Sequence, residues 1–218
     1  MEWVLRSFEQ VLYDPRIKEV IISDDFSDID TFARLLDCIE GMDKVHLYRN
    51  EKNLGCYFNK RRAIELATSE YCIILDSDNF VSTKYIDKLF VQEWNPKKIL
   101  APVMGFPSLN YTLFAGVTLT KENVNSYLPV GNLLMCLNTF NFFINRSEYL
   151  RLFDDSIEPW TSDSIWFNYC WLAGGNSFHI VDGLSYHHEI HSGSHYQEHN
   201  RKAPGFYESV IEKLKALK

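Results

Sequence analysis

The sequence predicts an α/β fold with a Rossmann-like, mostly parallel sheet and helices on both faces. Short apolar runs alternate with segments of helical spacing through the first half of the chain. Acidic residues directly follow two of these runs, as at the ligand-binding edge of open α/β sheets. The chain has 218 residues without a repeat or linker, so we expect a single domain over residues 1–218.

The first half of the chain supplies the clearest elements. Apolar residues recur at helical spacing over residues 3–12, and the Asp-Pro pair that follows ends this segment. Apolar runs bounded by polar residues and glycines predict the remaining strands, and amphipathic spacing predicts the helices between them. We expect strands at 19–23, 45–48 and 73–75 and helices at 29–39 and 58–67.

The second half is less regular. Its apolar runs predict strands at 100–103, 113–119, 140–144 and 177–181, and its helical spacing predicts helices at 147–153 and 160–172. Residues 186–199 read as a polar, histidine-rich loop.

Composition excludes several classes of protein. The net charge of −7 argues against a nucleic-acid-binding surface, which would show a basic face. Five cysteines are dispersed without a C-x-x-C pair, which indicates reduced thiols and neither a disulfide framework nor a zinc site. No signal peptide and no apolar span of about 18 residues occurs. We therefore expect a soluble, cytoplasmic protein without an integral membrane segment.

The most informative stretch is the strand that runs into Asp76-Ser77-Asp78. Two carboxylates one residue apart at the carboxyl end of a buried strand predict a site for a hard cation. Such a Mg²⁺ or Mn²⁺ ion usually serves a phosphate-bearing substrate, whose oxygens complete its coordination. A simple turn, in which Asp and Ser are common, explains the same residues on local grounds.

A second acidic pair follows the first predicted strand. Right-handed crossovers would gather the ends of the strands on one edge, so Asp24, Asp25, Asp76 and Asp78 are expected to share a rim. Four carboxylates on one rim repel each other unless a cation or a hydrogen-bonding base lies among them. This arrangement favours a bound ligand.

In their order along residues 3–194, the motifs resemble those of the GT-A glycosyltransferases, particularly the family 2 type. Individually each motif is modest, but their common order is specific. The resemblance rests on five segments in order. They are a D-D-x-S-like segment at 20–27, an N-x-G segment with the helix after it at 53–64, a D-x-D motif at 76–78, an acceptor-side E-D-like motif at 160–163, and a His close to Gly-Ser at 186–194.

For the donor, the resemblance implies a nucleotide-diphosphate sugar, most often a UDP-sugar, bound in about residues 1–100. Asp24 and Asp25 would meet the base and ribose, with Asn53 in the turn beyond them. Lys60 takes the usual Arg place near the nucleotide, and Arg61 is the neighbouring candidate for phosphate or base. A helix face exposed to water is the alternative for both cations.

For the metal, the resemblance implies Mn²⁺ (or Mg²⁺) held by Asp78, with Asp76 contacting it directly or through the ribose. His191 aligns with the family histidine that follows the catalytic core, and His188 is its close competitor. A solvated histidine-rich loop is the alternative interpretation.

For the acceptor, the resemblance implies a hydroxyl of a glycan, glycoprotein or lipid-linked molecule bound in about residues 101–218. Asp163 would be the general base, taking the proton as the acceptor oxygen attacks the anomeric carbon opposite the diphosphate, which predicts inversion. Helix capping is the alternative role, because Asp is a favoured cap.

The chain departs from the family pattern at its start. Family members begin with an apolar strand before the first helix, whereas Met1 falls directly at that helix, so the usual first strand is expected to be missing. Two rival functions remain: a nucleotidyltransferase, which would normally show a glycine-rich loop after the first strand, and a non-catalytic sugar-nucleotide-binding protein.

Overall fold

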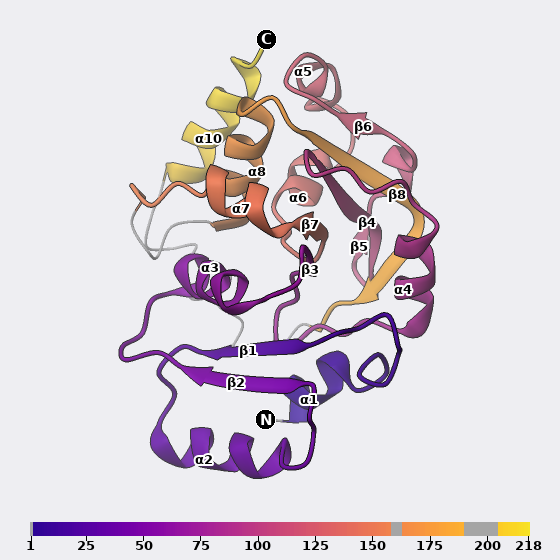
Figure 1. Cartoon of the computed structure of the whole chain (residues 1–218). Coiled ribbons are helices and arrows are strands. Elements are labelled where there is room, and N and C mark those ends of the chain that lie inside the picture. The colour runs from indigo at the N-terminus through magenta and orange to yellow at the C-terminus, as the bar shows by residue number, and fades with distance from the viewer. Residues whose placement is uncertain (1, 158–162, 190–204) are drawn as a thin grey trace.

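The computed structural model describes residues 2–157, 163–189 and 205–218 (Figure 1). In the first half, apolar runs form strands and the amphipathic segments between them form helices. The elements are α1 (Glu2–Phe8), β1 (Val20–Asp24), α2 (Ile29–Cys38), β2 (Val45–Arg49), α3 (Cys56–Leu66), β3 (Tyr71–Ile73) and α4 (Thr83–Phe90).

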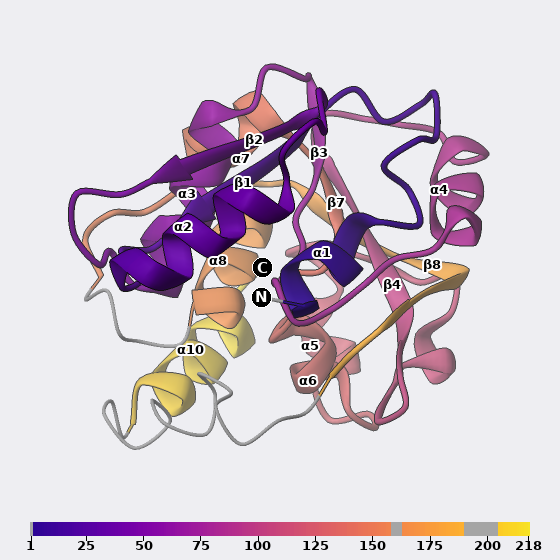
Figure 2. The same ribbon diagram turned by 90° about the horizontal axis from the view of Figure 1, so that it is seen from below.

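The second half adds a longer, twisted layer of strands with helices packed behind it (Figure 2). Its elements are β4 (Lys98–Phe106), β5 (Leu109–Asn110), the 3₁₀ helix η1 (Thr112–Phe114), β6 (Thr118–Leu119), α5 (Val124–Tyr127), α6 (Leu133–Leu137), β7 (Phe143–Asn145), α7 (Arg146–Leu152), α8 (Asp163–Ala173), β8 (Ser177–His187) and α10 (Phe206–Lys215).

The predicted α/β class is confirmed, but the strands are mixed in direction and lie in two separate sheets. Parallel β1 and β2 form one sheet, and the other runs in the order β3-β7-β4-β8-β6, with β5 beside β4. Within the larger sheet only β4 and β8 are parallel. Among the described strands, β2 is the single partner of β1 and β7 the single partner of β3.

Local chemistry sets where several helices begin. The Asp28 side chain accepts the Thr31 N–H at 2.9 Å and starts α2, and Asn145 accepts the Glu148 N–H at 3.0 Å and starts α7. Gly55 precedes α3 with a φ of 79°, a conformation that side chains rarely adopt. Asp28 and Gly55 follow the carboxyl ends of the parallel strands β1 and β2, whereas Asn145 pairs with Tyr71 at the start of β3.

Several predicted elements differ in detail. The helix expected at 3–12 ends at Phe8, and the strand expected at 140–144 is the three-residue β7. The expected strand at 113–119 is a 3₁₀ turn followed by the two-residue β6, because the Asn110 side chain accepts the N–H and hydroxyl of Thr112 at 3.0 and 2.7 Å. Such a local turn competes with a strand. The predicted loop at 186–199 begins too early, since β8 continues through His187.

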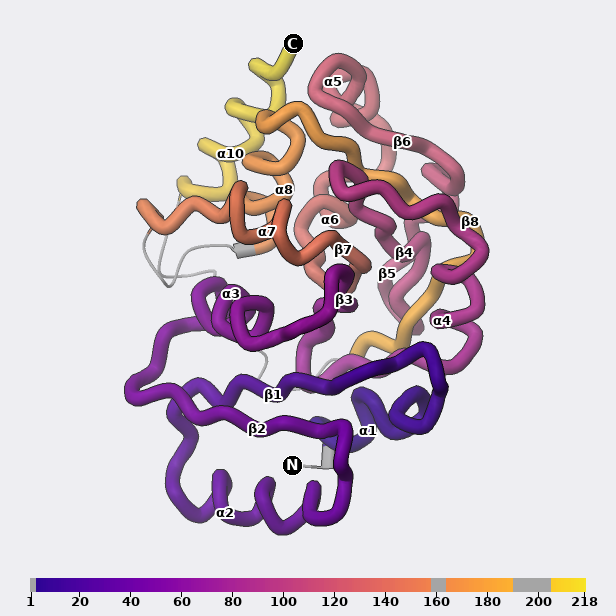
Figure 3. The backbone as a smooth tube through the Cα atoms, in the orientation of Figure 1, coloured from indigo at the N-terminus to yellow at the C-terminus, as the bar shows by residue number. Residues whose placement is uncertain are grey.

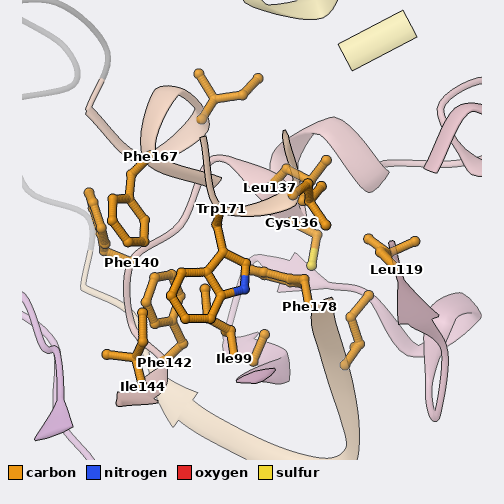
Figure 4. Packing of buried hydrophobic residues seen from close by; sticks show 14 of the residues in the cluster. Ile99, Leu119, Cys136, Leu137, Phe140, Phe142, Ile144, Phe167, Trp171 and Phe178 are labelled. Atoms are coloured by element: carbon orange, nitrogen blue, oxygen red, sulfur yellow. The ribbon is translucent and has the colours of Figure 1, made fainter. Parts of the chain in front are cut away.

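The main core lies between the larger sheet and α7, α8 and α10. Figure 4 shows Trp171 of α8 among aromatic rings, and its indole N–H donates to the Ser177 carbonyl at 2.8 Å. Phe140 and Phe142 are also fully buried there and flank Asn141 in the chain. Each such ring contributes roughly 1.5–3 kcal/mol through burial. The core therefore fixes the backbone on both sides of Asn141.

Candidate active site

A cavity of about 1430 Å³ opens beside β1 and β3 and contains several of the predicted site residues. Lys60 of α3, Asp76 and Asp78 of the loop after β3, and His188 at the end of β8 line it. Asn79, which the sequence pattern did not single out, lines it as well. Elements far apart in the sequence thus bring two carboxylates, an amine and an imidazole to one cavity.

Two buried asparagines hold Asp76 at the end of β3. The Asp76 N–H donates to Asn141 Oδ1 at 3.1 Å, and Asp76 Oδ2 accepts from the side-chain amides of Asn79 and Asn141 at 3.4 Å. Both asparagines are almost fully buried. Asp76 Oδ1 lies 2.9 Å from Lys60 Nζ, so the carboxylate is oriented by neutral amides on one side and a cation on the other.

Asn79 also orients His188. Its Oδ1 accepts the Glu189 N–H at 3.2 Å and lies 3.1 Å from His188 Nδ1, while its amide nitrogen faces Asp76 and Asn141. Because a carboxamide oxygen only accepts, this network assigns the proton of His188 to Nδ1. In the neutral ring the lone pair of Nε2 is then available to a ligand.

Burial keeps the neighbouring Tyr186 neutral, and the nearby carboxylates add to this effect. Burial raises the pKa of Tyr186 far above its usual value, and the negative charges of Asp76 and Asp78 contribute to the increase. Lys60 Nζ also lies 5.0 Å from the centroid of the Phe140 ring, a cation–π arrangement. Lys60 is therefore positioned from two sides in the cavity.

The acidic pair after β1 supports the turn and does not line the cavity. Asp25 accepts the N–H groups of Leu54 and Gly55 at 2.7 and 2.9 Å. Asp24 is buried, and its Oδ2 lies 3.5 Å from Arg49 Nε. Among the four predicted acids of the rim, the structure brings only the Asp76 pair into the cavity.

Asn53 and Arg61 have partners of their own. Asn53 is exposed and its Oδ1 accepts the Gly55 N–H at 3.0 Å. Arg61 Nε donates to Glu65 at 2.8 Å, and the guanidinium lies 3.7 Å from Asp155, beyond the end of α7. Lys60, and not Arg61, is thus the α3 cation paired with the carboxylate after β3.

The proposed acceptor side is described only in part. Asp163 is the first residue of α8, as expected for a residue in or just before the first turn of this helix. Its side chain lies outside the described part of the structure. Ser164, the next residue, lines the cavity. The motif residues 160–162 and the metal candidate His191 lie outside the described residues.

The donor atoms suit a hard or borderline divalent cation. Carboxylate oxygens of Asp76 and Asp78 are the ligands that Mg²⁺ and Mn²⁺ prefer, and the imidazole of His188 suits Mn²⁺ as a further ligand. Within residues 2–157, 163–189 and 205–218, no three His, Cys, Asp or Glu side chains are arranged to hold a metal ion. An ion on the carboxylate pair would therefore need phosphate oxygens and water at its other positions.

Asparagines are the site residues that pattern reasoning missed. Asn59 Oδ1 accepts from Ser23 Oγ at 2.7 Å and from Asn50 Nδ2 at 2.9 Å, and Asn50 Nδ2 also donates to Asp25 at 3.1 Å. The position of Asn59 inside α3 could have marked it as a site residue, because Asn is unfavourable in a helix interior unless its side chain makes specific hydrogen bonds. No comparable signal marks Asn141.

The chain resembles known proteins in sequence over its first half and in fold over nearly all of it. Residues 2–99 match the model of glycosyl transferase family 2. No curated protein matches the chain by sequence. The predicted resemblance to this family is therefore confirmed over that region.

Solved structures extend the likeness to the whole fold. The crystal structure of S. aureus TarS 1–349 in complex with UDP-GlcNAc is 15% identical, with a TM-score of 0.67, and the match covers 98% of this chain and 62% of that one. GalNAc-T7, crystallised with UDP, GalNAc and Mn²⁺, is 16% identical, with a TM-score of 0.66 and coverage of 94% and 46%. The fold is that of the GT-A glycosyltransferases, and the chain spans less than two thirds of the length of these structures.

The described helices were compared with the length and apolarity that a membrane-spanning helix needs. No described helix is long and apolar enough to cross a bilayer.

Proposed function

We propose that this chain, whose residues 2–99 match glycosyl transferase family 2 and whose fold is GT-A, is a metal-dependent glycosyltransferase. It would move a sugar from a nucleotide-diphosphate sugar, most simply a UDP-sugar, to a hydroxyl acceptor. The observation that carries the proposal is the pair Asp76 and Asp78 at the end of β3, lining a large cavity beside Lys60.

The donor would lie along the ends of β1 and β3. The base and ribose would lie beside the turn that Asp25 and the buried Asp24 support from outside the cavity lining, and Asn53 would border that turn. Lys60 would attract the diphosphate and orient it toward Asp76. A Mn²⁺ or Mg²⁺ ion between the carboxylates and the diphosphate would neutralise the charge that develops as the diphosphate departs.

Three residues would serve the metal and the acceptor. His188, with its proton on Nδ1, would offer Nε2 to the metal side of the cavity, and His191 is the alternative ligand. Asp163 would remove the proton from the acceptor hydroxyl while the oxygen attacks from the face opposite the diphosphate. The chemical consequence is inversion at the anomeric carbon.

A non-catalytic sugar-nucleotide-binding protein is the second candidate, favoured by one observation. β1 and β3, which flank the donor side, are not joined by any described strand, and most of their residues are only partly buried. A donor site built on two separate sheets is less preorganised, and catalysis depends on preorganisation more than binding does.

A donor screen separates the two functions. The protein is incubated with Mn²⁺ and a panel of UDP-, GDP- and dTDP-sugars, and released nucleoside diphosphate is measured beside binding by calorimetry. We expect release from one donor, abolished by chelation and reduced at least 100-fold in Asp163→Asn. The exposed Asp182→Asn is the matched control and should match the unmodified chain. Binding without release, or a transfer product with retained configuration, would contradict the proposed mechanism.

A further inference from the structure

The large cavity extends beyond the proposed donor site to a second end beside α10. Side chains from β5, α6, α8 and α10 line this end, which we call the α10 pocket. Figure 3 shows α6, α8 and α10 together on one side of β3, with β1 and β2 on the other. The residues that define the pocket are Leu109, Met135, Asn138, Thr139, Ser164 and Tyr207.

The segment between α6 and β7 connects the α10 pocket to the proposed metal site. At the α6 end, the buried Asn168 of α8 donates its side-chain amide to the carbonyls of Leu137 and Thr139 at 2.8 and 3.2 Å. At the β7 end, Asn141 accepts the Asp76 N–H at 3.1 Å. The segment therefore holds the pocket beside the carboxylate that would bind the metal.

The helix that anchors this segment also carries the candidate general base. Asp163 is the first residue of α8, and the buried Ser164 follows it and lines the pocket. Ser164 and Asn168 are four residues apart, so they lie on one face of the helix. A hydroxyl bound in the α10 pocket would thus lie between the start of α8 and Asp76.

Tyr111 lies between two walls of the pocket. Its side chain is fully buried, and its hydroxyl donates to the Met135 carbonyl of α6 at 3.2 Å. Burial raises the pKa of Tyr111 far above its usual value, with smaller contributions from neighbouring groups that include the Tyr207 phenol. Such a contribution requires the two phenol groups to lie close together. Met135 of α6 and Tyr207 of α10 therefore both lie near the hydroxyl of Tyr111.

Both walls present accessible carbon surface. The ring of Phe206 lies 5.8 Å from that of Trp166, which fixes the first turn of α10 against α8. Tyr207, the next residue, is only partly buried and lines the cavity. Met135 is 40% exposed. An aromatic ring and a thioether are thus available to a ligand in the pocket.

We propose that the α10 pocket is the acceptor subsite and takes a sugar ring, with Tyr207 stacked on one face of the ring and Met135 on the other. This inference rests on the glycosyltransferase function proposed above. A pyranose presents C–H groups on its faces, which fit aromatic and thioether side chains. It presents hydroxyl groups around its edge, which fit the neutral side chains of Asn138, Thr139 and Ser164. Tyr207 and Met135 are therefore specificity-determining residues for a glycan acceptor.

The other acceptor classes fit these walls less well. A Ser or Thr side chain presents one hydroxyl on a short stem, so it would reach the base without covering the ring of Tyr207. An alkyl alcohol would cover this ring but would offer no further hydroxyl to the amide and hydroxyl groups beside it.

Transfer by the whole protein, with Mn²⁺ and the donor identified in the screen, tests the acceptor class. The candidate acceptors are methyl glycosides of glucose, galactose and N-acetylglucosamine, a short peptide rich in Ser and Thr, and octanol. We expect at least one methyl glycoside to raise nucleotide release at least tenfold above the rate without acceptor and to yield a disaccharide product by mass spectrometry. Transfer to the peptide or to octanol alone would overturn the proposal.

Direct binding separates failure of this proposal from failure of the proposed function. Saturation-transfer NMR of the methyl glycosides with the unmodified protein needs neither donor nor metal. Sugar binding without any nucleotide release would contradict the proposed catalysis and support the pocket. Nucleotide release without sugar binding or sugar transfer would support the proposed function and overturn the pocket, and the lack of both would refute both.

Tyr207→Ala provides the test at a single residue. Loss of the stacking ring should raise the KM for the sugar acceptor at least tenfold, and Tyr207→Phe, which keeps the ring, should restore it to within threefold. Tyr13→Ala is the control, because it removes the same ring from an exposed position that does not line the cavity, and it should match the unmodified chain. All three variants should melt cooperatively. An acceptor KM that is equal in Tyr207→Ala and Tyr13→Ala, or raised equally in Tyr207→Phe and Tyr207→Ala, would refute stacking.

Discussion

Asp76→Asn should separate activity from stability at the candidate active site. The substitution preserves shape but removes the negative charge that faces Lys60 at 2.9 Å and that we propose holds the metal. Loss of one charge that acts on the departing diphosphate should lower the rate about 10²–10³-fold, as for a single electrostatic stabiliser of a transition state.

The expected cost in stability is small. The Asp76 side chain is 38% exposed and that of Lys60 is 16% exposed, so solvent screens their attraction. A screened ion pair of this kind contributes about 1 kcal/mol or less. For a protein of this size, that corresponds to a fall in Tm of less than about 4 °C.

Nucleotide release with Mn²⁺ and the donor identified in the screen measures activity, and a calorimetric melt measures stability. Glu212→Gln is the control, because it also removes one short ion pair, with Lys215 at 2.7 Å, but at an exposed position of α10 that does not line the cavity. It should leave the rate unchanged. Nucleotide release by Asp76→Asn within threefold of the unmodified chain would refute the role given to this carboxylate, as would a fall in Tm large enough to explain the lost activity.

Three further predictions test the surroundings of the site. Lys60→Met should raise the KM for the donor about tenfold or more through the loss of a cation near the diphosphate, and steady-state kinetics with an unchanged KM would contradict this. Gly105→Ala should lower stability by about 1–3 kcal/mol in denaturant unfolding, because the added Cβ would lie 2.7 Å from the ring of Tyr186. Burial lowers the pKa of His179 from its usual value of 6.5 in the folded protein. Below about pH 6.5 the unfolded chain therefore binds a proton at His179 more readily than the folded chain does, and the free energy of unfolding falls as pH decreases. His179→Gln should flatten the stability profile between pH 7 and 5, and an unchanged slope would show that other groups dominate.

Local patterns in the sequence were sufficient for the strands and helices near the site. The runs before Asp24 and Asp76 are short, apolar and bounded by turn residues, so β1 and β3 are found where expected within about two residues. The cavity position of Asp76 and Asp78 was likewise expected, because the residues follow a strand directly. Such signals depend only on neighbours in the chain.

The supporting network could not be predicted in the same way. Asn141 contacts Asp76 across 65 positions of the chain, and Asn79 contacts His188 across 109. Nothing in the local sequence of an asparagine states which distant group it will orient. The pairing of β7 with β3, and the bridge between Phe80 and His187 of β8, bring these side chains together.

The mixed strand directions have a similar origin. The apolar runs of β3, β4 and β7 indicate strands, but direction depends on how the chain returns between them. β7 follows the irregular segment that contains α5 and α6 and enters between β3 and β4 in the opposite direction to both. Alternation of strands and helices predicts parallel pairing only where each connection is a single crossover helix, as between β1 and β2.

The composition of β1 and β3 connects the sequence to the split sheet. Val20-Ile21-Ile22 and Tyr71-Cys72-Ile73 have the character of central strands, which would be buried under helices on both faces. In the structure each has only one paired neighbour, and these residues are only partly buried. Exposed edges are usually protected by charges, bulges or proline, and these strands carry none of those devices within those runs. Their sequence therefore has the composition of buried central strands, although each of them pairs with a single described neighbour.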